Sequence, residues 1–373
     1  SLYTSRVVLQ TLGFSDYGIY SLVGGVVVIF SFLNSSLSGA TSRFLTYELG
    51  RGNLQRLKET FSSAIQVHLF IVFILAETLG LWFFTTKLVI PEERMFAAHV
   101  VYQCSIISTI VQIVQVPYDA SIIAHEKMNI YAYIELLSVF LRLVIVYLLL
   151  IGEFDKLDLY AVLVLSVQLI VALIYRSYSV RKFEECRFLF VRHPETFKSI
   201  LNFSSWNLYV QLSSSVRQLG LNSLVNIFFG VVYNASSGIA TTVDGAIAGF
   251  CTNVITAFRP QITKSYAQGK LEEMMRLMVN ASKYSQLLYL VIALPLLFEL
   301  PYVFEIWLGD VPPLSVEICR LLIITNIFFQ LTQIIHIAIH ATGNIKLLSL
   351  SNGTLLLFVL LPVFVLFRLG YGI

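Results

Sequence analysis

The chain has 373 residues, of which 57% are hydrophobic and only 13% are charged, and its formal net charge is +3. A composition this apolar exceeds what one soluble core can bury, and the small net charge gives no basis for nucleic acid binding. The apolar runs are long and continuous and lack the alternation of barrel strands, so they predict membrane-spanning helices. We therefore expect an all-α polytopic membrane protein.

Ten segments are long and apolar enough to span a bilayer, which takes about 20 helical residues. In chain order they cover residues 18–46, 62–86, 97–124, 130–151, 158–180, 201–229, 238–263, 279–304, 314–340 and 346–368. Residues 1–12 resemble the tail of an earlier helix, and the chain stops soon after a span. We therefore expect a chain that is truncated at both ends. The cysteines Cys104, Cys186, Cys251 and Cys319 lie far apart, which predicts packing residues and neither a metal site nor a disulfide framework.

The connectors between these spans alternate in charge. Basic residues follow the segments that end near 46, 124, 180 and 263, whereas acidic residues follow those that end near 151 and 304. Positive connectors remain in the cytoplasm. The pattern therefore predicts a cytoplasmic N-terminus.

Two sets of landmarks recur along the chain. Residues 52–55 (GNLQ) match 269–272 (GKLE), and residues 125–130 (HEKMNI) match 340–345 (HATGNI), at offsets of about 217 and 215. Each repeat holds an even number of spans, so both copies have the same orientation. We expect two parallel pseudo-repeat six-helix lobes around a central cavity. The first lobe is predicted at 1–182 with helices 1–6, helix 1 incomplete, and the second at 183–373 with helices 7–11 and later helices absent.

The start of the chain carries a further pattern. It consists of Ser5-Arg6-Val7-Val8-Leu9, Leu12-Gly13, Asp16-Tyr17-Gly18-Ile19-Tyr20 and Gly24-Gly25. With the order and spacing of the spans, this pattern resembles Wzx-type oligosaccharide flippases of the multidrug/oligosaccharidyl-lipid/polysaccharide (MOP) exporter superfamily. The resemblance implies a protein of the bacterial inner membrane that moves undecaprenyl-pyrophosphate-linked oligosaccharide, such as lipopolysaccharide O-antigen units, from the cytoplasmic to the outer leaflet by alternating access. It also implies membrane lipids, a polymerase and other polysaccharide assembly proteins as partners.

Polar residues recur at helical spacing in the segment 201–229. They are Asn207, Gln211, Ser214, Gln218 and Asn222, with Ser213 and Arg217 on the adjoining flank. Such a stripe does not belong against lipid, so we predict that Arg217, Asn207, Gln211 and Gln218 line a hydrated pathway for sugar hydroxyls. For the individual serines, hydrogen bonding between helices is an equally good interpretation.

Four more arginines lie in or at the ends of predicted spans. Arg43 and Arg259 occupy matching ends of the two repeats and are predicted to converge at the cavity mouth, where guanidinium groups suit phosphate oxygens. Snorkelling to lipid headgroups is the alternative for this pair. Arg6 and Arg142 lie deeper, which makes snorkelling a poorer explanation, and we predict that they contact cargo.

Four carboxylates lie within predicted spans, where a charge is costly and normally has a partner or meets water. They are Asp119, Glu77, Asp244 and Glu135. Each is predicted either to bind a coupling H⁺ or Na⁺ or to form an ion pair with an arginine. Apart from this coupling ion, we expect no cofactor.

Two other functions are open to a chain of this kind. A cation-coupled drug antiporter of the same superfamily needs an acidic, aromatic pocket, whereas the membrane arginines favour an anionic cargo. A membrane-embedded polysaccharide polymerase needs acid and base groups on a sizeable outer loop. The predicted outer connectors are short and carry no HExxH, P-loop or Ser/His/Asp signature, so we expect no enzyme.

Overall fold

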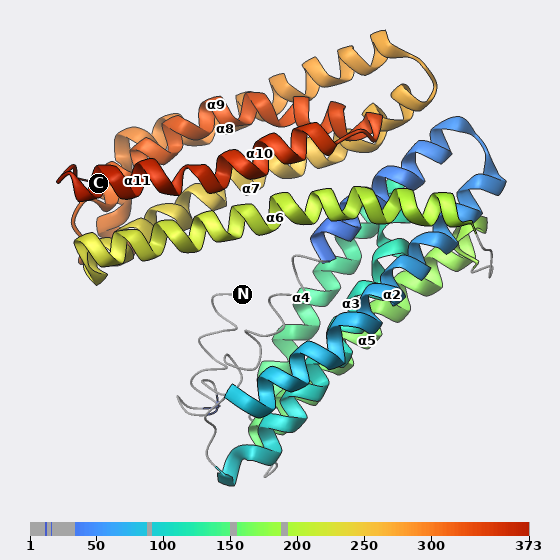
Figure 1. Cartoon of the computed structure of the whole chain (residues 1–373), viewed down its shortest axis with the longest axis horizontal. Coiled ribbons are helices and arrows are strands. Elements are labelled where there is room, and N and C mark those ends of the chain that lie inside the picture. The colour runs from blue at the N-terminus through green and yellow to red at the C-terminus, as the bar shows by residue number, and fades with distance from the viewer. Residues whose placement is uncertain are drawn as a thin grey trace. The chain divides into compact units, whose positions relative to one another are not determined.

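The computed structural model describes residues 34–87, 92–149, 155–187 and 193–372, together with Leu12 and Asp16. Throughout these ranges the chain is helical and has no strand, which confirms the all-α class. Residues 1–11 of the predicted helix tail and residues 18–33 of the predicted span 18–46 lie outside the described residues. After the helix that ends at Arg51, the elements are α2 (Leu54–Lys87), η1 (Glu92–Arg94), α3 (Met95–Ala124), α4 (Met128–Leu148), α5 (Lys156–Lys182), η2 (Glu184–Cys186), α6 (Pro194–Phe229), α7 (Val231–Ala267), α8 (Leu271–Leu308), α9 (Ser315–Thr342), α10 (Lys346–Phe358) and α11 (Leu360–Arg368) (Figure 1).

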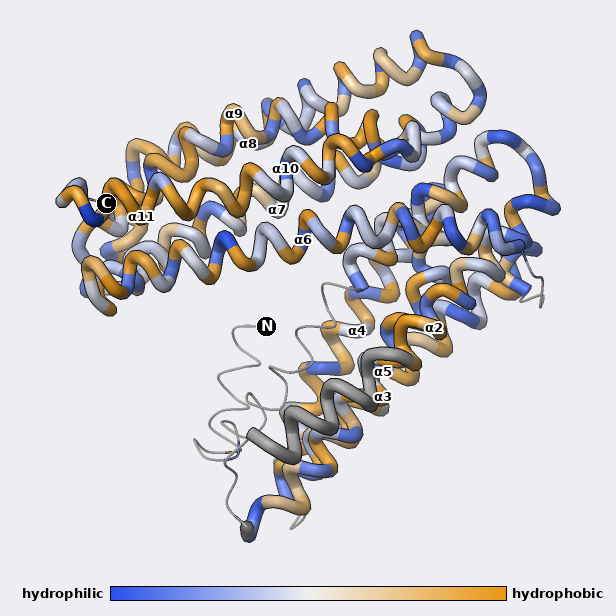
Figure 2. Tube along the Cα trace, viewed as in Figure 1, coloured by the Kyte–Doolittle hydropathy of each residue, from blue (hydrophilic) through white to orange (hydrophobic). Residues whose placement is uncertain are grey.

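Seven segments of the described chain are long and apolar enough to cross a membrane. They are Met95–Ala124, Met128–Ile145, Lys156–Lys182, Val231–Ala267, Leu271–Leu308, Ser315–Thr342 and Lys346–Arg368. The chain is accordingly a multi-pass membrane protein. Figure 2 shows that hydrophilic residues recur along α6, whereas α11 is largely hydrophobic.

Two predicted spans differ from the observed helices at points where proline acts. The span predicted at 346–368 forms two helices, because Pro362 has no N–H to bond the carbonyl of Phe358 four residues earlier. The span predicted from residue 201 starts at Pro194, the first position of α6, where proline's missing N–H costs nothing.

The first compact unit, residues 1–204, is built around the pair α3 and α5. Polar contacts join these two helices at both ends. Arg94 pairs with Asp155 where the helices begin, and His125 Nε2 lies 2.6 Å from Glu185 Oε1 just beyond where they end. The two helices therefore run parallel. Around them, Phe61 of α2 meets Tyr118 of α3 edge to face at 5.3 Å.

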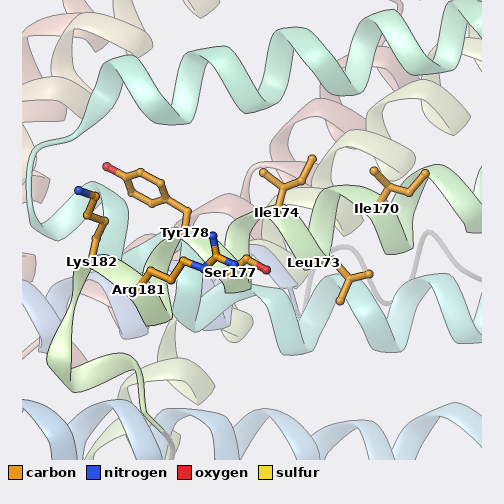
Figure 3. Close-up of a pocket in the computed structure, with 7 residues that line it drawn as sticks. All are labelled: Ile170, Leu173, Ile174, Ser177, Tyr178, Arg181 and Lys182. Carbon is orange, nitrogen blue, oxygen red and sulfur yellow. The ribbon is translucent and has the colours of Figure 1, made fainter.

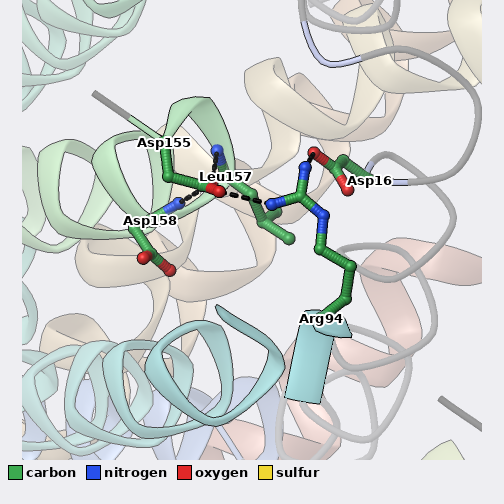
Figure 4. A network of polar contacts seen from close by, with 5 residues as sticks. All are labelled: Asp16, Arg94, Asp155, Leu157 and Asp158. Atoms are coloured by element: carbon green, nitrogen blue, oxygen red, sulfur yellow. Dashed lines mark hydrogen bonds and ion pairs between the residues drawn. The ribbon is translucent and has the colours of Figure 1, made fainter. Parts of the chain in front are cut away.

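The guanidinium of Arg94 also bonds Asp16, with 2.6 Å between Nη2 and Oδ2, so one arginine holds two carboxylates (Figure 4). Asp155 is the N-cap of α5 and accepts the backbone N–H of Leu157 at 3.0 Å. Partial burial disfavours the Asp155 anion, but the hydrogen bonds from Arg94 and from two backbone N–H groups outweigh it and hold the pKa of this carboxyl below its usual value. Asp155 is thus ionised at neutral pH.

In the second compact unit, residues 205–373, helices α7, α8 and α9 pack on one another. Buried Tyr289 of α8 donates its hydroxyl hydrogen to the carbonyl of Ile323 in α9 at 3.0 Å. Helix α10 lies against α6 at Gly353, which has no side chain to hold it away from the ring of Tyr209. The rings of Phe229 and Phe367 continue this contact into α11 at 4.8 Å.

Helix α6 belongs to both units. The contact-based division falls between Ser204 and Ser205, inside α6, and not at the predicted boundary of 182 and 183. The reason is that the first turns of α6 pack on the first unit, where Phe197 meets Phe70 at 6.0 Å and Phe203 meets Phe44 at 5.8 Å. No irregular linker separates the units at this point.

Backbone geometry supports the predicted duplication at the first pair of landmarks. Gly52 and Gly269 both have positive φ, 69° and 74°. Each donates its N–H to a carbonyl three residues back, Leu49 at 3.1 Å and Tyr266 at 3.0 Å, and each directly precedes the connector into a new helix. The same turn therefore occurs at both landmarks, at the predicted offset; Gly343, which bonds the carbonyl of His340 before α10, makes it as well.

Candidate functional site

A polar cavity of about 500 Å³ lies within the second unit, between α6, α7, α9 and α10. Its lining residues are Asn207, Val210, Gln211, Ser214 and Arg217 of α6, Arg259 of α7, Phe329, Gln333, His336, Ile337 and His340 of α9, and Leu348, Ser349, Asn352 and Leu356 of α10. The volume is typical of small-ligand sites. None of the lining residues is an aspartate or a glutamate.

Helix α6 supplies one wall of this cavity through residues that recur every three or four positions. Asn207, Gln211, Ser214 and Arg217 share one helical face, as their spacing predicts. Gln218 was predicted to join them, but it is not a lining residue, and its side-chain amide donates along the helix to Asn222 at 3.4 Å. The wall therefore presents amides, a hydroxyl and one guanidinium.

Arg217 and Arg259 make the cavity cationic. Neither guanidinium forms an ion pair with a described residue, and Nε of Arg217 is buried without a hydrogen-bond partner. Both side chains are half-buried, so each positive charge is only partly hydrated. Two unneutralised guanidinium groups in one partly enclosed space favour an anion, and their fork geometry suits carboxylate or phosphate oxygens.

Helices α9 and α10 contribute the residues that sequence reasoning did not assign to a site. Gln333, His336 and His340 follow helical spacing along α9, and Asn352 faces the cavity from α10. The spacing of the α9 residues was a visible signal. It carried no information about which helix lies opposite, since contacts between helices far apart in sequence are not encoded in a local period.

The other predicted arginines lie elsewhere. Arg43 belongs to the first unit, and its guanidinium lies over the rings of Phe44 and Tyr47, each centroid 4.7 Å away. Its convergence with Arg259 stays a prediction. Arg142 is exposed on α4 and forms no hydrogen bond or ion pair with a described residue. Arg6 lies outside the described residues.

Two of the predicted carboxylates lie in the first unit, among α3, α4 and α5. Both oxygens of Asp119 accept from the side-chain amide of Gln115 at 3.2 Å, and Gln115 in turn accepts from Gln168 of α5 at 3.2 Å. Glu135 of α4 accepts the hydroxyl hydrogen of Tyr175 at 2.9 Å. The two carboxylates are close enough to repel each other when both are ionised.

The other two carboxylates differ. Asp244 of α7 accepts two hydrogen bonds from the amide of Asn326 of α9, at 2.5 and 2.6 Å, outside the cavity. The side chain of Glu77 lies outside the described part of the structure. Across the described ranges no group of three histidine, cysteine or acidic side chains could hold a metal ion, and the predicted coupling ion remains a prediction.

The four cysteines are free, and three of them, Cys186, Cys251 and Cys319, are buried. Burial raises the pKa of the Cys186 thiol, in the connector after α5, to about 12. This thiol is therefore neutral at physiological pH and behaves as a packing residue.

Solved structures share this fold over nearly the whole chain. A multidrug resistance MATE family transporter of the MOP superfamily in an outward-facing conformation has a TM-score of 0.74 at 15% identity, covering 96% of this chain and 80% of that one. A MATE in the bent conformation has a TM-score of 0.77 at 15% identity, with coverages of 96% and 80%. A MOP superfamily transporter from Pyrococcus furiosus, whose binding pocket is described as having reverse polarity that suggests a different function, has a TM-score of 0.67 at 14% identity, with coverages of 98% and 90%.

These likenesses establish the two-lobed fold of MATE proteins of the MOP superfamily. At such low identity they describe architecture alone. Neither the family models nor the curated proteins searched with this sequence give a match.

Proposed function

We propose that this protein is a flippase that moves an anionic, lipid-linked oligosaccharide across the bacterial inner membrane by alternating access, and that it is not an enzyme. The observation that carries the proposal is the cavity of the second unit, which holds Arg217 and Arg259 and no carboxylate. A pyrophosphate needs cationic, fork-shaped donors, and sugar hydroxyls need amide and hydroxyl partners. Asn207, Gln211 and Asn352 supply those partners beside the two arginines.

The polarity of this cavity also weighs against the drug antiporter. An organic cation requires a carboxylate or an aromatic face in its pocket, and Phe329 is the cavity's one aromatic side chain apart from its histidines. Asp244 is held by Asn326 away from the cavity. The Pyrococcus furiosus transporter, which shares this fold, is described as having a binding pocket of reverse polarity that suggests a different function. We therefore use the polarity of the pocket to distinguish classes of cargo within this fold.

A reconstituted transport assay tests the cargo directly. Arg217→Gln and Arg259→Gln are compared with wild type for translocation of a fluorescent polyprenyl-pyrophosphate-linked sugar in proteoliposomes, at equal protein incorporation. A hydrogen bond to a charged group contributes about 1.5–3 kcal/mol, so each variant should bind this substrate roughly 10- to 100-fold more weakly.

Arg320→Gln is the matched control, because Arg320 is an arginine of the same unit whose Nε donates to the carbonyl of Leu297 outside the cavity, at 3.2 Å. We expect near-normal transport from this control. Wild-type transport by both cavity variants, or efflux of ethidium that depends on Arg217 and Arg259, would overturn the proposal. In cells, loss of the protein should leave lipid-linked repeat units on the cytoplasmic face, whereas a polymerase defect would shorten chains already at the surface.

For coupling to an ion, we propose Asp119 as the site in the first unit. It is half-buried, its side-chain partner among the described residues is the neutral amide of Gln115, and it lies near a second carboxylate, so protonation or a bound cation would relieve its charge. Asp119→Asn keeps the shape and removes the charge. Transport by this variant should no longer respond to an imposed H⁺ or Na⁺ gradient, and an unchanged response would exclude Asp119.

A further inference from the structure

An open groove runs along one face of α5 in the first unit, with a volume of about 550 Å³. Its seven lining residues, drawn in Figure 3, all come from this helix and repeat every three or four positions: Ile170, Leu173, Ile174, Ser177, Tyr178, Arg181 and Lys182. Residues at this spacing lie on one face of α5, and along that face the side chains change from apolar to cationic toward the C-terminal end of the helix. The groove therefore has an apolar stem and a positively charged head.

A second groove of about 510 Å³ lies on the other side of the same helical ridge. It shares Leu173, Ser177 and Arg181 with the first groove, and it extends to Tyr118 of α3 and to Arg187 beyond η2. The shared residues are spaced by four, so they form a continuous ridge along α5. Two parallel grooves thus flank one ridge, and both reach the same cationic end.

The cations at this end are not neutralised by the part of the chain that the structure describes. Arg176, Arg181, Lys182 and Arg187 are exposed, and none forms an ion pair with a described residue. The nearest acidic residues in sequence have other partners, since Glu184 pairs with Lys58 at 3.3 Å and Glu185 with His125 at 2.6 Å. Cations in the last turn of a helix interact favourably with the negative end of its dipole, which would explain Arg181 and Lys182 at the end of α5. This interaction explains neither Arg176 nor Arg187.

The apolar stem lies where lipid chains would meet it. Helix α5 is one of the segments able to span the membrane, and the side chains of Ile170 and Leu173 are 44% and 59% exposed. Apolar groups exposed on a membrane-spanning helix are solvated by acyl chains. A cationic cluster at the end of such a helix lies at headgroup depth, where basic pockets recognise anionic phosphate groups.

We propose that this double groove is a binding site for an anionic phospholipid of the surrounding membrane. One acyl chain lies in each groove, on either side of the ridge of Leu173 and Ser177. The phosphate lies among Arg181, Lys182 and Arg187. The inference goes beyond the proposed transport function and does not depend on it, because a resident lipid would occupy this face whatever the cargo is.

Native mass spectrometry of the intact chain, titrated with phosphatidylglycerol or phosphatidylethanolamine, tests the site. Wild type should retain phosphatidylglycerol preferentially. In Arg181→Gln/Lys182→Gln the affinity for phosphatidylglycerol should fall about 30-fold, as expected for losing two basic headgroup contacts. Arg276→Gln/Lys283→Gln removes two exposed cations of α8 that form no ion pair with a described residue, and it should bind like wild type.

Ser177→Trp tests the contribution of the grooves to lipid binding separately from that of the positive charges. Ser177 is exposed on the shared ridge, so an indole there would obstruct both grooves while leaving every cation in place. We expect it to weaken binding of phosphatidylglycerol at least 10-fold. Equal losses in the α5 and α8 double variants, equal affinity for the two lipids, or wild-type binding by Ser177→Trp would each overturn the proposal.

Discussion

The contact between α6 and α10 depends on the absence of a side chain at Gly353. A Cβ at this position would lie 2.4 Å from Cε1 and 2.8 Å from Cδ1 of Tyr209, and 3.1 Å from Oγ of Ser213. Ordinary contacts between carbon atoms are about 3.5–4.0 Å, so either the ring or α10 must move by about 1 Å. Overpacking of this kind costs about 1–3 kcal/mol. Gly353 lies inside α10, so the gain of about 0.5–1 kcal/mol from replacing a helical glycine offsets part of this cost, and we expect Gly353→Ala to lower the free energy of unfolding by about 0.5–2 kcal/mol.

Thermal unfolding of the purified protein in detergent measures this loss, and Gly249→Ala is its matched control. Gly249 lies inside α7, and an added Cβ there meets no atom within 4 Å. Replacing a helical glycine with alanine in open space should stabilise by about 0.5–1 kcal/mol. The same substitution is thus expected to change stability in opposite directions at the two positions.

A double-mutant cycle identifies the cause of the loss. In a Tyr209→Leu background the ring is absent, so Gly353→Ala should cost much less than it does in the wild-type background. Equal costs in the two backgrounds, or no loss of stability from Gly353→Ala, would refute the reasoning. Because Asn352 and Ser349 line the polar cavity from the same helix, we also expect Gly353→Ala to reduce transport.

Two further predictions concern the ends of α3 and α5. Asp155→Asn should lower stability at pH 7 by less than about 1 kcal/mol, because the pair with Arg94 is more than a third exposed, and because asparagine still caps α5 and Arg94 keeps its pair with Asp16. The pKa of Asp155 is lowered on folding, so the stabilisation by this ion pair is fully present above the unfolded pKa of about 3.9 and is lost as the pH falls through the folded pKa. A stability difference between variant and wild type that does not change with pH would contradict this account. His125→Ala leaves buried Glu185 without its partner and should cost about 2–3 kcal/mol in thermal unfolding, part of which Glu185→Gln should restore. A double variant no more stable than His125→Ala would argue against this account.

Local patterns predicted much of this fold, because membrane helices satisfy their backbone hydrogen bonds internally and leave a long apolar signal. The span predicted at 97–124 corresponds to α3, Met95–Ala124, and the glycine landmarks at 52 and 269 have the same backbone geometry. Helix ends were less predictable where the chain is polar. The first turns of α6 carry Glu195 and Lys198, which an apolar window excludes although Pro194 marks the true start.

Only the part of the candidate site that lies on a single helix, α6, was predicted from the sequence. The α6 stripe of Asn207, Gln211 and Arg217 was visible because its period is local. That α9 and α10 lie opposite it, and that Gln218 faces elsewhere, depends on packing between helices more than 100 residues apart in sequence, such as the approach of Gly353 to Tyr209. A single sequence holds no record of such pairs.

Because α6 is one continuous helix that belongs to both units, it affects how one unit can move against the other. Its first roughly three turns are fixed to one unit and the rest to the other, and from Glu195 to Leu219 it contains neither proline nor glycine. An intact helix transmits bending and torque, whereas an irregular linker dissipates them. Any rotation of one lobe must therefore load the hydrogen-bond ladder around Ser204 and Ser205. A movement of one lobe against the other would therefore meet the stiffness of this short stretch of α6.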